Sequence, residues 1–220
     1  MRYHLLVAAA AACLGLTTTP ALADTATFDD IPNTGNAVQS GTVTSGGMNF
    51  TGAHYHIIDS ADARLVRNAS TSYLAAEAAG ALGKPVTFAL ASGGLFTLNS
   101  VDVAELWLPG NNLNDFQDVV FSGIQQGGGL LSLTFTLDGL RDGAGGIDDF
   151  QTVLFAGWTN LQSVTVTGRN ANGAFGDYSI DNIVFNGAVP EPSAWLLMIL
   201  GFGTVGAAMR RRGTVRAAVG

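Results

Sequence analysis

The side chains able to do chemistry in this chain are scattered, and no catalytic pattern joins them. The sequence contains no Gly-x-Ser-x-Gly, no His-Glu-x-x-His and no cysteine placed as a nucleophile. The paired carboxylates Asp148 and Asp149 could serve a glycosidase, but they lie in a predicted glycine-rich loop. Nothing in the sequence sets the distance to a second acid that glycoside hydrolysis requires. We therefore predict no catalytic residues and no enzyme activity, and we keep an extracellular glycoside-active enzyme as the alternative.

Three aromatic side chains, Trp107, Trp158 and Tyr178, are the candidates for ligand binding. An aromatic face suits the apolar C–H groups of a sugar ring. Trp107 also precedes a predicted turn at residues 109–112, and binding groups often lie in such turns. The alternative is that both tryptophans belong to the core.

Asp29, Asp30 and Asp181 are the candidates for a structural calcium site. In an extended strand Asp30 shares a face with Phe28, and Asp181 shares a face with Ile183. If the apolar partners point inward, the carboxylates do too, and buried carboxylates are costly unless they are paired or bind a metal. Calcium takes six to eight oxygen ligands and fits this demand. The alternative is that these acids cap turns or accept backbone N–H bonds at strand ends.

The elements that must position these residues are β-strands, because apolar and polar residues alternate along most of the chain. Residues 131–137, for example, alternate Leu or Phe with Ser or Thr. Glycine and asparagine clusters separate such stretches, and many short strands of this kind indicate an antiparallel β-sandwich. Only residues 71–79 hint at a helix, and Tyr73 and Leu74 could equally begin a strand. The predicted strands are 25–31, 38–44, 47–51, 54–58, 85–90, 96–99, 101–108, 117–124, 131–137, 150–155, 163–167 and 178–185.

Charge excludes one class of partner. Between Asp24 and Val189 there are sixteen acidic and five basic residues, a net charge of −11. Phosphate backbones would be repelled, so we expect no nucleic-acid partner. The only cysteine, Cys13, lies in the predicted leader, so the mature chain cannot form an intramolecular disulfide.

The N-terminus has the features of a signal peptide over residues 1–23. Arg2 is followed by a short apolar run, and Ala21-Leu22-Ala23 forms an A-x-A cleavage site before Asp24.

The C-terminus has three parts: Pro190, Glu191 and Pro192 with Trp195 close behind, then an apolar run to Met209, then Arg210, Arg211 and Arg212. The run is roughly 22 Å of helix, against a hydrocarbon core of about 30 Å, which predicts a short membrane anchor. The arginines should stay cytoplasmic and leave the preceding domain outside.

This C-terminal pattern closely resembles the PEP-CTERM sorting signal, in its variant with Trp three residues after the second proline. The resemblance covers residues 189–212 and implies that an exosortase in the inner membrane cuts near the Pro-Glu-Pro motif. It also implies export, temporary anchoring by the C-terminal helix, and release to the cell surface or the medium.

The region between the two ends resembles the jelly-roll domains found ahead of such signals, on residues 27–31, 161–168 and 178–183. Carbohydrate-binding modules share this layout, and they commonly carry a calcium ion at a place comparable to the three aspartates. The resemblance implies a sugar-binding or matrix role.

These observations define four regions and one function. We expect a signal peptide (1–23), an all-β, jelly-roll-like sandwich (24–187), a sorting signal (188–212) and a cytoplasmic tail (213–220). The expected function is a non-catalytic binding or matrix protein that associates with exopolysaccharide, with an exosortase as its processing partner. A glycoside-active enzyme and a purely structural envelope protein are the alternatives.

Processing is the first testable prediction. The mature protein should begin at Asp24 and end near residues 190–192, because the peptidase sites lie there, and the intact mass of the extracellular protein measures both ends. A surface form that still carries Arg210–Arg212 would contradict the sorting prediction.

Overall fold

The computed structural model describes residues 23–35, 37–59, 72–76, 85–105, 117–139, 150–170, 173, 175–187, 199–200 and 202–203. The chain separates into a compact unit, Ala21–Ala188, and a second unit made of Met1–Pro20 and Val189–Gly220. Within Ala21–Ala188 every described regular element is a β-strand. In the second unit, the few described residues (199, 200, 202 and 203) are helical.

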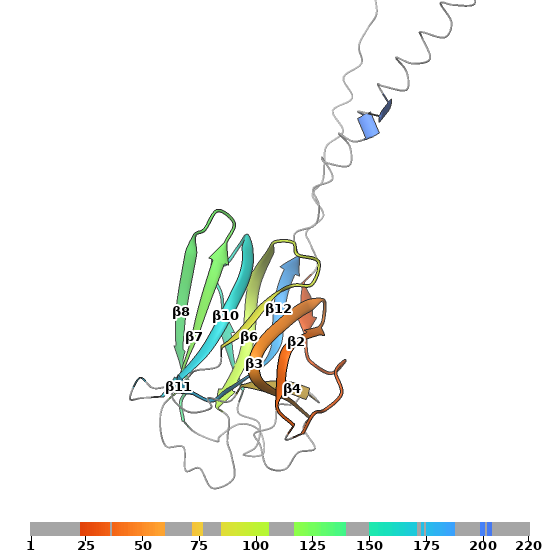
Figure 1. Cartoon of the computed structure of the whole chain (residues 1–220). Coiled ribbons are helices and arrows are strands. Elements are labelled where there is room, and N and C mark those ends of the chain that lie inside the picture. The colour runs from red at the N-terminus through yellow and green to blue at the C-terminus, as the bar shows by residue number, and fades with distance from the viewer. Residues whose placement is uncertain are drawn as a thin grey trace, which may run out of the picture. The chain divides into compact units, whose positions relative to one another are not determined.

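The described residues of the compact unit form twelve strands, most of which are labelled in Figure 1. They are β1 (Asp24–Ala26), β2 (Gln39–Ser45), β3 (Met48–Asp59), β4 (Ser72–Ala76), β5 (Val86–Leu90), β6 (Phe96–Glu105), β7 (Gln117–Gln125), β8 (Leu130–Thr136), β9 (Gln151–Leu154), β10 (Leu161–Asn170), β11 (Phe175–Gly176) and β12 (Tyr178–Gly187).

All strand pairings are antiparallel, and the sheet folds over into two layers. The first layer, which we call the front layer, has the order β8-β7-β10-β5-β3-β2. The second, the back layer, contains β9-β6-β12 with β4 and β1 beside β12. Strand β3 joins them, because residues 48–52 pair with β5 and residues 55–59 pair with β4. The predicted antiparallel β-sandwich is confirmed.

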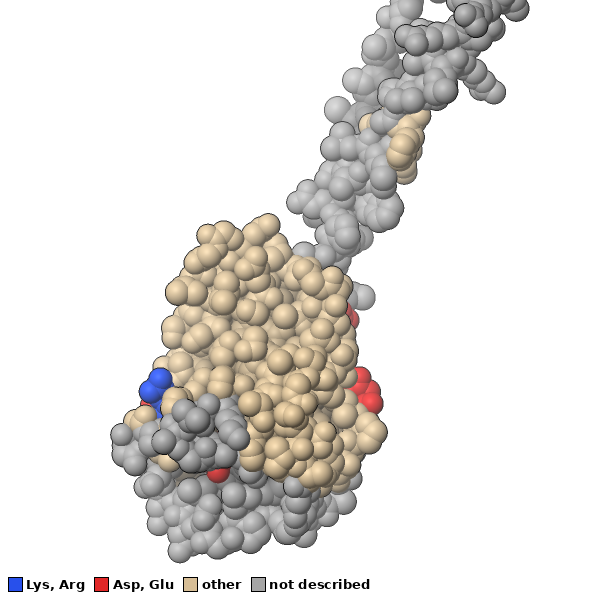
Figure 2. Space-filling model, viewed as in Figure 1, with Lys and Arg blue, Asp and Glu red and all other residues tan. Residues whose placement is uncertain are grey.

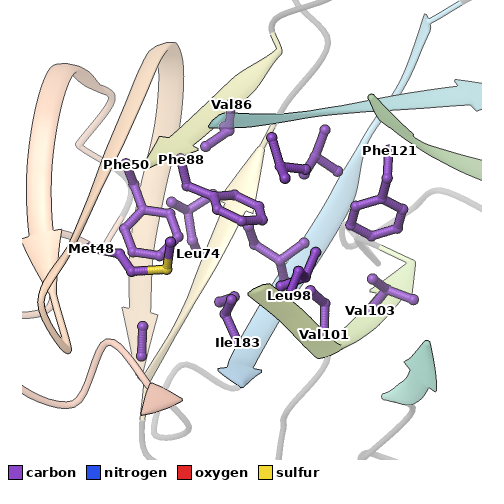
Figure 3. Close-up of a cluster of buried hydrophobic side chains, with 14 of the residues drawn as sticks. Met48, Phe50, Leu74, Val86, Phe88, Leu98, Val101, Val103, Phe121 and Ile183 are labelled. Carbon is purple, nitrogen blue, oxygen red and sulfur yellow. The ribbon is translucent and has the colours of Figure 1, made fainter. Parts of the chain in front are cut away.

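The core lies between the inward faces of the two layers. Apolar residues alternate with polar ones along the strands, so that Val86 and Phe88 of β5 are buried while Thr87 between them is partly exposed. Figure 3 shows side chains of β3, β5 and β7 meeting those of β4, β6 and β12. Phe28, Phe50 and Phe88 form a chain of ring contacts inside this core, with centroids 4.7 and 5.7 Å apart.

The Tyr178 hydroxyl ties the two layers together inside the core. Tyr178 belongs to β12 in the back layer, and its hydroxyl donates to the Val166 carbonyl of β10 at 2.9 Å. The same oxygen accepts a hydrogen bond from the Val86 N–H of β5 at 3.3 Å. Burial raises the pKa of this phenol well above its usual value, with a smaller opposing effect from the Val86 N–H. The hydroxyl is therefore a structural group of the core.

The sequence placed most strands correctly, and the differences have physical reasons. Residues 47–51 with 54–58, and 96–99 with 101–108, were predicted as separate strands but are the two long strands β3 and β6. Residues 72–76 form strand β4, as the strand alternative for this stretch predicted, because all five side chains are buried. The expected first strand, 25–31, ends at Ala26, because Phe28 has a positive φ of 60° and the chain turns there. No helix among the described residues has the length and apolarity to cross a membrane.

Replacing Tyr178 with Phe tests the tie between the layers. The variant loses two buried hydrogen bonds, so we expect about 1–3 kcal/mol less stability at neutral pH. In the wild type the folded-state pKa of Tyr178 is raised, so its stabilising contribution is complete below pH 10 and declines above it. Denaturant melts from pH 8 to 11 should therefore fall less steeply with pH in Tyr178→Phe. Equal slopes for both proteins would show that Tyr178 does not carry this pH dependence.

Candidate ligand-binding face

Trp158 does not face a ligand, because its ring is part of the core. It is only 5% exposed and packs edge-to-face against Phe155, with ring centroids 4.9 Å apart. Gly123 of β7 leaves the space that the indole occupies: a Cβ at this position would lie 2.8 Å from a Trp158 ring carbon. The core alternative for Trp158 is correct, and the ligand-binding prediction for this residue is wrong.

Tyr178 is a core residue as well, 2% exposed, and so it cannot stack on a sugar outside the domain. Trp107 lies outside the described residues, and so do Asp148 and Asp149. The residues of the sorting motif, Pro190 to Pro192, Trp195 and Arg210 to Arg212, and the cleavage residues Ala21 and Leu22 also lie outside them.

The three candidate calcium ligands are not gathered into a site. Asp29 and Asp30 are exposed, whereas Asp181 is fully buried. The parity argument fails at the first strand, which stops before Phe28 and leaves Asp30 exposed. At the last strand Asp181 is buried as expected, although Asn182 beside it has a positive φ of 45° and the β12 register shifts between Asp181 and Val184. Within the described residues, no group of three His, Cys, Asp or Glu residues is arranged to hold a metal ion.

Each of the three carboxylates instead accepts hydrogen bonds from nearby protein groups, as the alternative of turn capping and backbone N–H bonds predicted. Asp30 accepts from the Ser45 hydroxyl at 2.6 Å and from the Gly46 N–H at 3.3 Å. Asp29 accepts from the Ser72 N–H at 2.9 Å, and Asp181 from the N–H of Asn182 at 2.7 Å. The Ser45 hydroxyl in turn accepts from the buried Phe28 N–H at 3.0 Å, so Asp30 fixes the turn that carries Phe28 into the core.

The outer face of the front layer presents a feature that the sequence analysis missed. One hydroxyl residue of each strand falls on the same cross-strand row, and these residues are paired by register from one edge of the layer to the other. We call them the hydroxyl row: Ser132 (β8), Ser122 (β7), Thr165 (β10), Thr87 (β5), Thr51 (β3) and Thr42 (β2).

The hydroxyl row is regular, exposed and partly preorganised. Neighbouring strands lie about 4.8 Å apart, so six strands place the row over about 24 Å. Its members are exposed or half-exposed. Two pairs are already hydrogen-bonded, Thr42 to Thr51 at 2.7 Å and Thr87 to Thr165 at 2.9 Å. Threonine is β-branched and stiff at χ1, so little side-chain entropy remains to be lost on binding.

The surface around the row is almost without charge, and the apolar residues Ile124 and Leu130 lie exposed on one adjacent row. Figure 2, seen from the same side as Figure 1, shows charged residues only at the margins of the described surface. On the adjacent rows lie Thr44 and Asn49, which are hydrogen-bonded at 2.7 Å, and Thr134 and Thr167 on either side of Val120. The face can therefore donate and accept hydrogen bonds to a neutral partner, and it offers no described metal site or acid–base pair.

The register of the strands explains why the row escaped the sequence analysis. The outward direction of Thr and Ser was evident from the alternation in each strand. Their alignment depends on pairings between residues such as Thr51 and Thr87, or Thr87 and Thr165, which are far apart in sequence. Only the folded sheet brings these side chains into one line.

The C-terminal segment was compared with known families. The family model described as the PEP-CTERM protein-sorting motif matches residues 188–212. The chain carries a PEP-CTERM sorting motif. This motif confirms the resemblance drawn from Pro190 to Arg212 and indicates export, a membrane-anchored C-terminus before exosortase processing, and then a surface location. No curated protein matches the sequence.

Two solved structures match the chain at low similarity. A family 11 carbohydrate-binding module from Clostridium thermocellum, solved with a β-1,3-1,4-mixed-linked tetrasaccharide, is 14% identical. Its TM-score is 0.32, and the match covers 76% of this chain and 97% of the module. The enzymatically active domain of tailspike protein 4 of bacteriophage CBA120 is 10% identical, with a TM-score of 0.31. That match covers 69% of this chain but only 19% of the tailspike chain. Neither structure identifies a ligand of this chain.

Asp30→Ala tests the reassignment of the candidate calcium ligands. The variant removes the acceptor of the Ser45 hydroxyl, and we expect a loss of about 1 kcal/mol, the usual net value of one hydrogen bond. Because that bond needs no metal, the loss should be the same in millimolar calcium and in chelator, and Asp30→Asn should retain part of the stability. Thermal melts measure both. A wild-type midpoint that rises with calcium, and does so less in Asp30→Ala, would restore the metal site.

Proposed function

We propose that the mature protein is a non-catalytic matrix component at the cell surface that binds neutral exopolysaccharide through the hydroxyl row. The observation that carries this proposal is the unbroken line of six Ser and Thr side chains across the front layer. The PEP-CTERM sorting motif supports it, since a sorted surface protein meets extracellular polymers.

The chemistry of the row favours a neutral polyhydroxylated ligand. Each Ser or Thr hydroxyl offers one donor and two acceptors, and sugar hydroxyls offer the same. The net charge of −11 between Asp24 and Val189 disfavours an anionic polymer. The spacing of the row, about 4.8 Å per strand, is close to the length of one hexose unit in an extended glycan. A polymer lying across the strands can therefore meet a new hydroxyl at each step.

The absence of aromatic residues from the row predicts weak binding per sugar. A hydrogen bond that replaces one to water contributes about 0.5–1.5 kcal/mol net, and association itself costs about 4–15 kcal/mol. Short oligosaccharides should therefore bind poorly, and affinity should increase with chain length as more contacts form along one polymer. The proposed role is the retention of long chains at the surface.

Removing two hydroxyls from the centre of the row tests the proposal. Thr87→Val with Thr165→Val keeps both β-branched shapes but removes the bonded hydroxyl pair, so we expect roughly 10-fold weaker polymer binding. Affinity electrophoresis of the mature protein in gels containing neutral polysaccharides measures this, with a polyuronate gel as the charge control.

The matched control is Thr25→Val with Thr97→Val, which removes two threonine hydroxyls from β1 and β6 of the back layer. This control should migrate as the wild type does. The proposal fails if no neutral polysaccharide retards the protein, which favours a purely structural envelope role. It also fails if the central double variant is retarded as much as the wild type. Release of sugar from a retarding polymer would instead support the enzyme alternative.

A further inference from the structure

The edges of the sheet differ in how well they are protected. A strand at a sheet edge has unpaired backbone groups that can pair with another chain, and proteins usually blunt such edges with short strands, bulges, proline or charge. Here β1, β9 and β11 have only three, four and two residues. Strand β2 is longer, but its register with β3 shifts between Gln39 and Gly41, and Gly41 has a positive φ of 95°.

Strand β8 has none of these protective features. Its seven residues, Leu-Leu-Ser-Leu-Thr-Phe-Thr, include no charge, proline or glycine. It pairs with β7 through seven consecutive residues without a register shift. On its other side no described strand pairs with it, and it lies at the margin of the front layer (Figure 1). Seven uncharged residues of high β-propensity at an edge are typical of a segment that adds strands.

The apolar side chains of β8 are only partly covered. Leu131, Leu133 and Phe135 pack against the core but remain half-buried, and Leu130 on the outer face is 79% exposed. A neighbouring strand at this edge would cover the first three while it satisfied the backbone groups of β8.

We propose that β8 pairs antiparallel with β8 of a second copy of this chain, joining the two front layers into one continuous layer. The surface is self-complementary, as a two-fold interface requires. It does not rest on polysaccharide binding, because it depends on the edge of the sheet and not on the hydroxyl row.

The period of the strand fixes the register of this pairing. Residues directly opposite each other in an antiparallel pair point to the same face of the sheet. Full overlap of seven residues places Leu133 opposite Leu133 of the second copy and Leu131 opposite Phe135. On the other face, Ser132 then lies opposite Thr134. This register matches the three inward apolar residues with one another and Ser132 with Thr134, while Leu130 lies opposite Thr136 at each end. A shift by one residue would put most of the inward apolar residues opposite hydroxyls.

A second copy fits this edge better than the other described strands do. Pairing of β8 with β2 of another copy would meet the bulge at Gly41, and the remaining edges are too short to cover seven residues. The edge also lacks the charges that a charged peptide partner would need.

A cysteine at the two-fold axis tests the register. The mature chain has no cysteine, since Cys13 lies in the predicted leader. In the processed protein from the extracellular fraction, Leu133→Cys should form an intermolecular disulfide under mild oxidation, because the two Cβ atoms are about 5 Å apart across the pair. Thr44→Cys on β2 is the control and should remain monomeric. Equal cross-linking of the two variants, or none in a folded Leu133→Cys, overturns the proposal.

Charge at the exposed position 134 gives a second test that leaves the core untouched. In this register residue 134 of one copy is a diagonal neighbour of residue 134 of the other, and diagonal neighbours are within reach of long side chains. Two lysines in a Thr134→Lys dimer should therefore repel each other, and so should two glutamates in a Thr134→Glu dimer. We expect each variant to sediment as a monomer at concentrations where the wild type is at least half dimeric. An equimolar mixture of the two should regain the dimer.

A control on β2 distinguishes pairing between two β8 strands from pairing of β8 with another strand. Thr44→Lys on β2 adds the same charge and should leave the dimer unchanged. A monomeric wild type overturns the proposal. Loss of association in Thr44→Lys, or a mixture that stays monomeric, shows that β8 pairs with a different strand and overturns the two-fold arrangement.

Discussion

The domain depends on the burial of one apolar layer between the inward faces of its strands. The compact unit Ala21–Ala188 contains no cysteine, so no disulfide within it can compensate for a poor core. Ring contacts among Phe28, Phe50 and Phe88 fill part of the space between the layers. Two polar groups enter this space with partners: the Tyr178 hydroxyl bonds to β5 and β10, and the Ser45 hydroxyl bonds to the Phe28 N–H and to Asp30. Burial of such groups would otherwise oppose folding.

The two-residue period of the strands made much of the fold predictable from the sequence, and prediction failed where that period is interrupted. Alternation located most strands and the all-β class, because inward apolar residues such as Val164 and Val166 recur at every second position. It failed at Asn182, where a residue with positive φ shifts the register and brings Ile180 and Ile183 to the same side, although they are three residues apart. Asp181 is buried, as the parity argument expected, but it accepts a hydrogen bond from the Asn182 N–H, and no described group of three metal-binding residues surrounds it. Trp158 was ambiguous for another reason: the space that buries it is made by Gly123, whose role depends on a pairing distant in sequence.

The same period produces the outer face. When every second residue must be apolar to build the core, the residues between them are free to be polar, and this chain uses Thr and Ser there rather than Lys or Glu. Threonine suits a strand because its branched side chain packs well on a pleated surface. The resulting face carries hydroxyls in place of charges, although the domain as a whole is acidic. An acidic domain can therefore present a neutral surface to a neutral polymer.

The open edge and the hydroxyl face belong to the same layer, and their geometry links them. In a two-fold pair of β8 strands, Ser132 at the end of one hydroxyl row lies opposite Thr134 of the second copy. The line of side chains then continues through Val120 and Thr167 of that copy, which share the row of Thr134. The hydroxyl row of one copy is thus continued by the row that contains Thr134 in the second copy. That row lies two residues along β8 from the second copy's own hydroxyl row. A polymer that crosses the joint meets hydroxyls from both copies, with the strand spacing unchanged and a gap in the hydroxyls at Val120. Because contacts along one chain add to the avidity, pairing at the edge would favour long polymers over short ones without any new kind of contact.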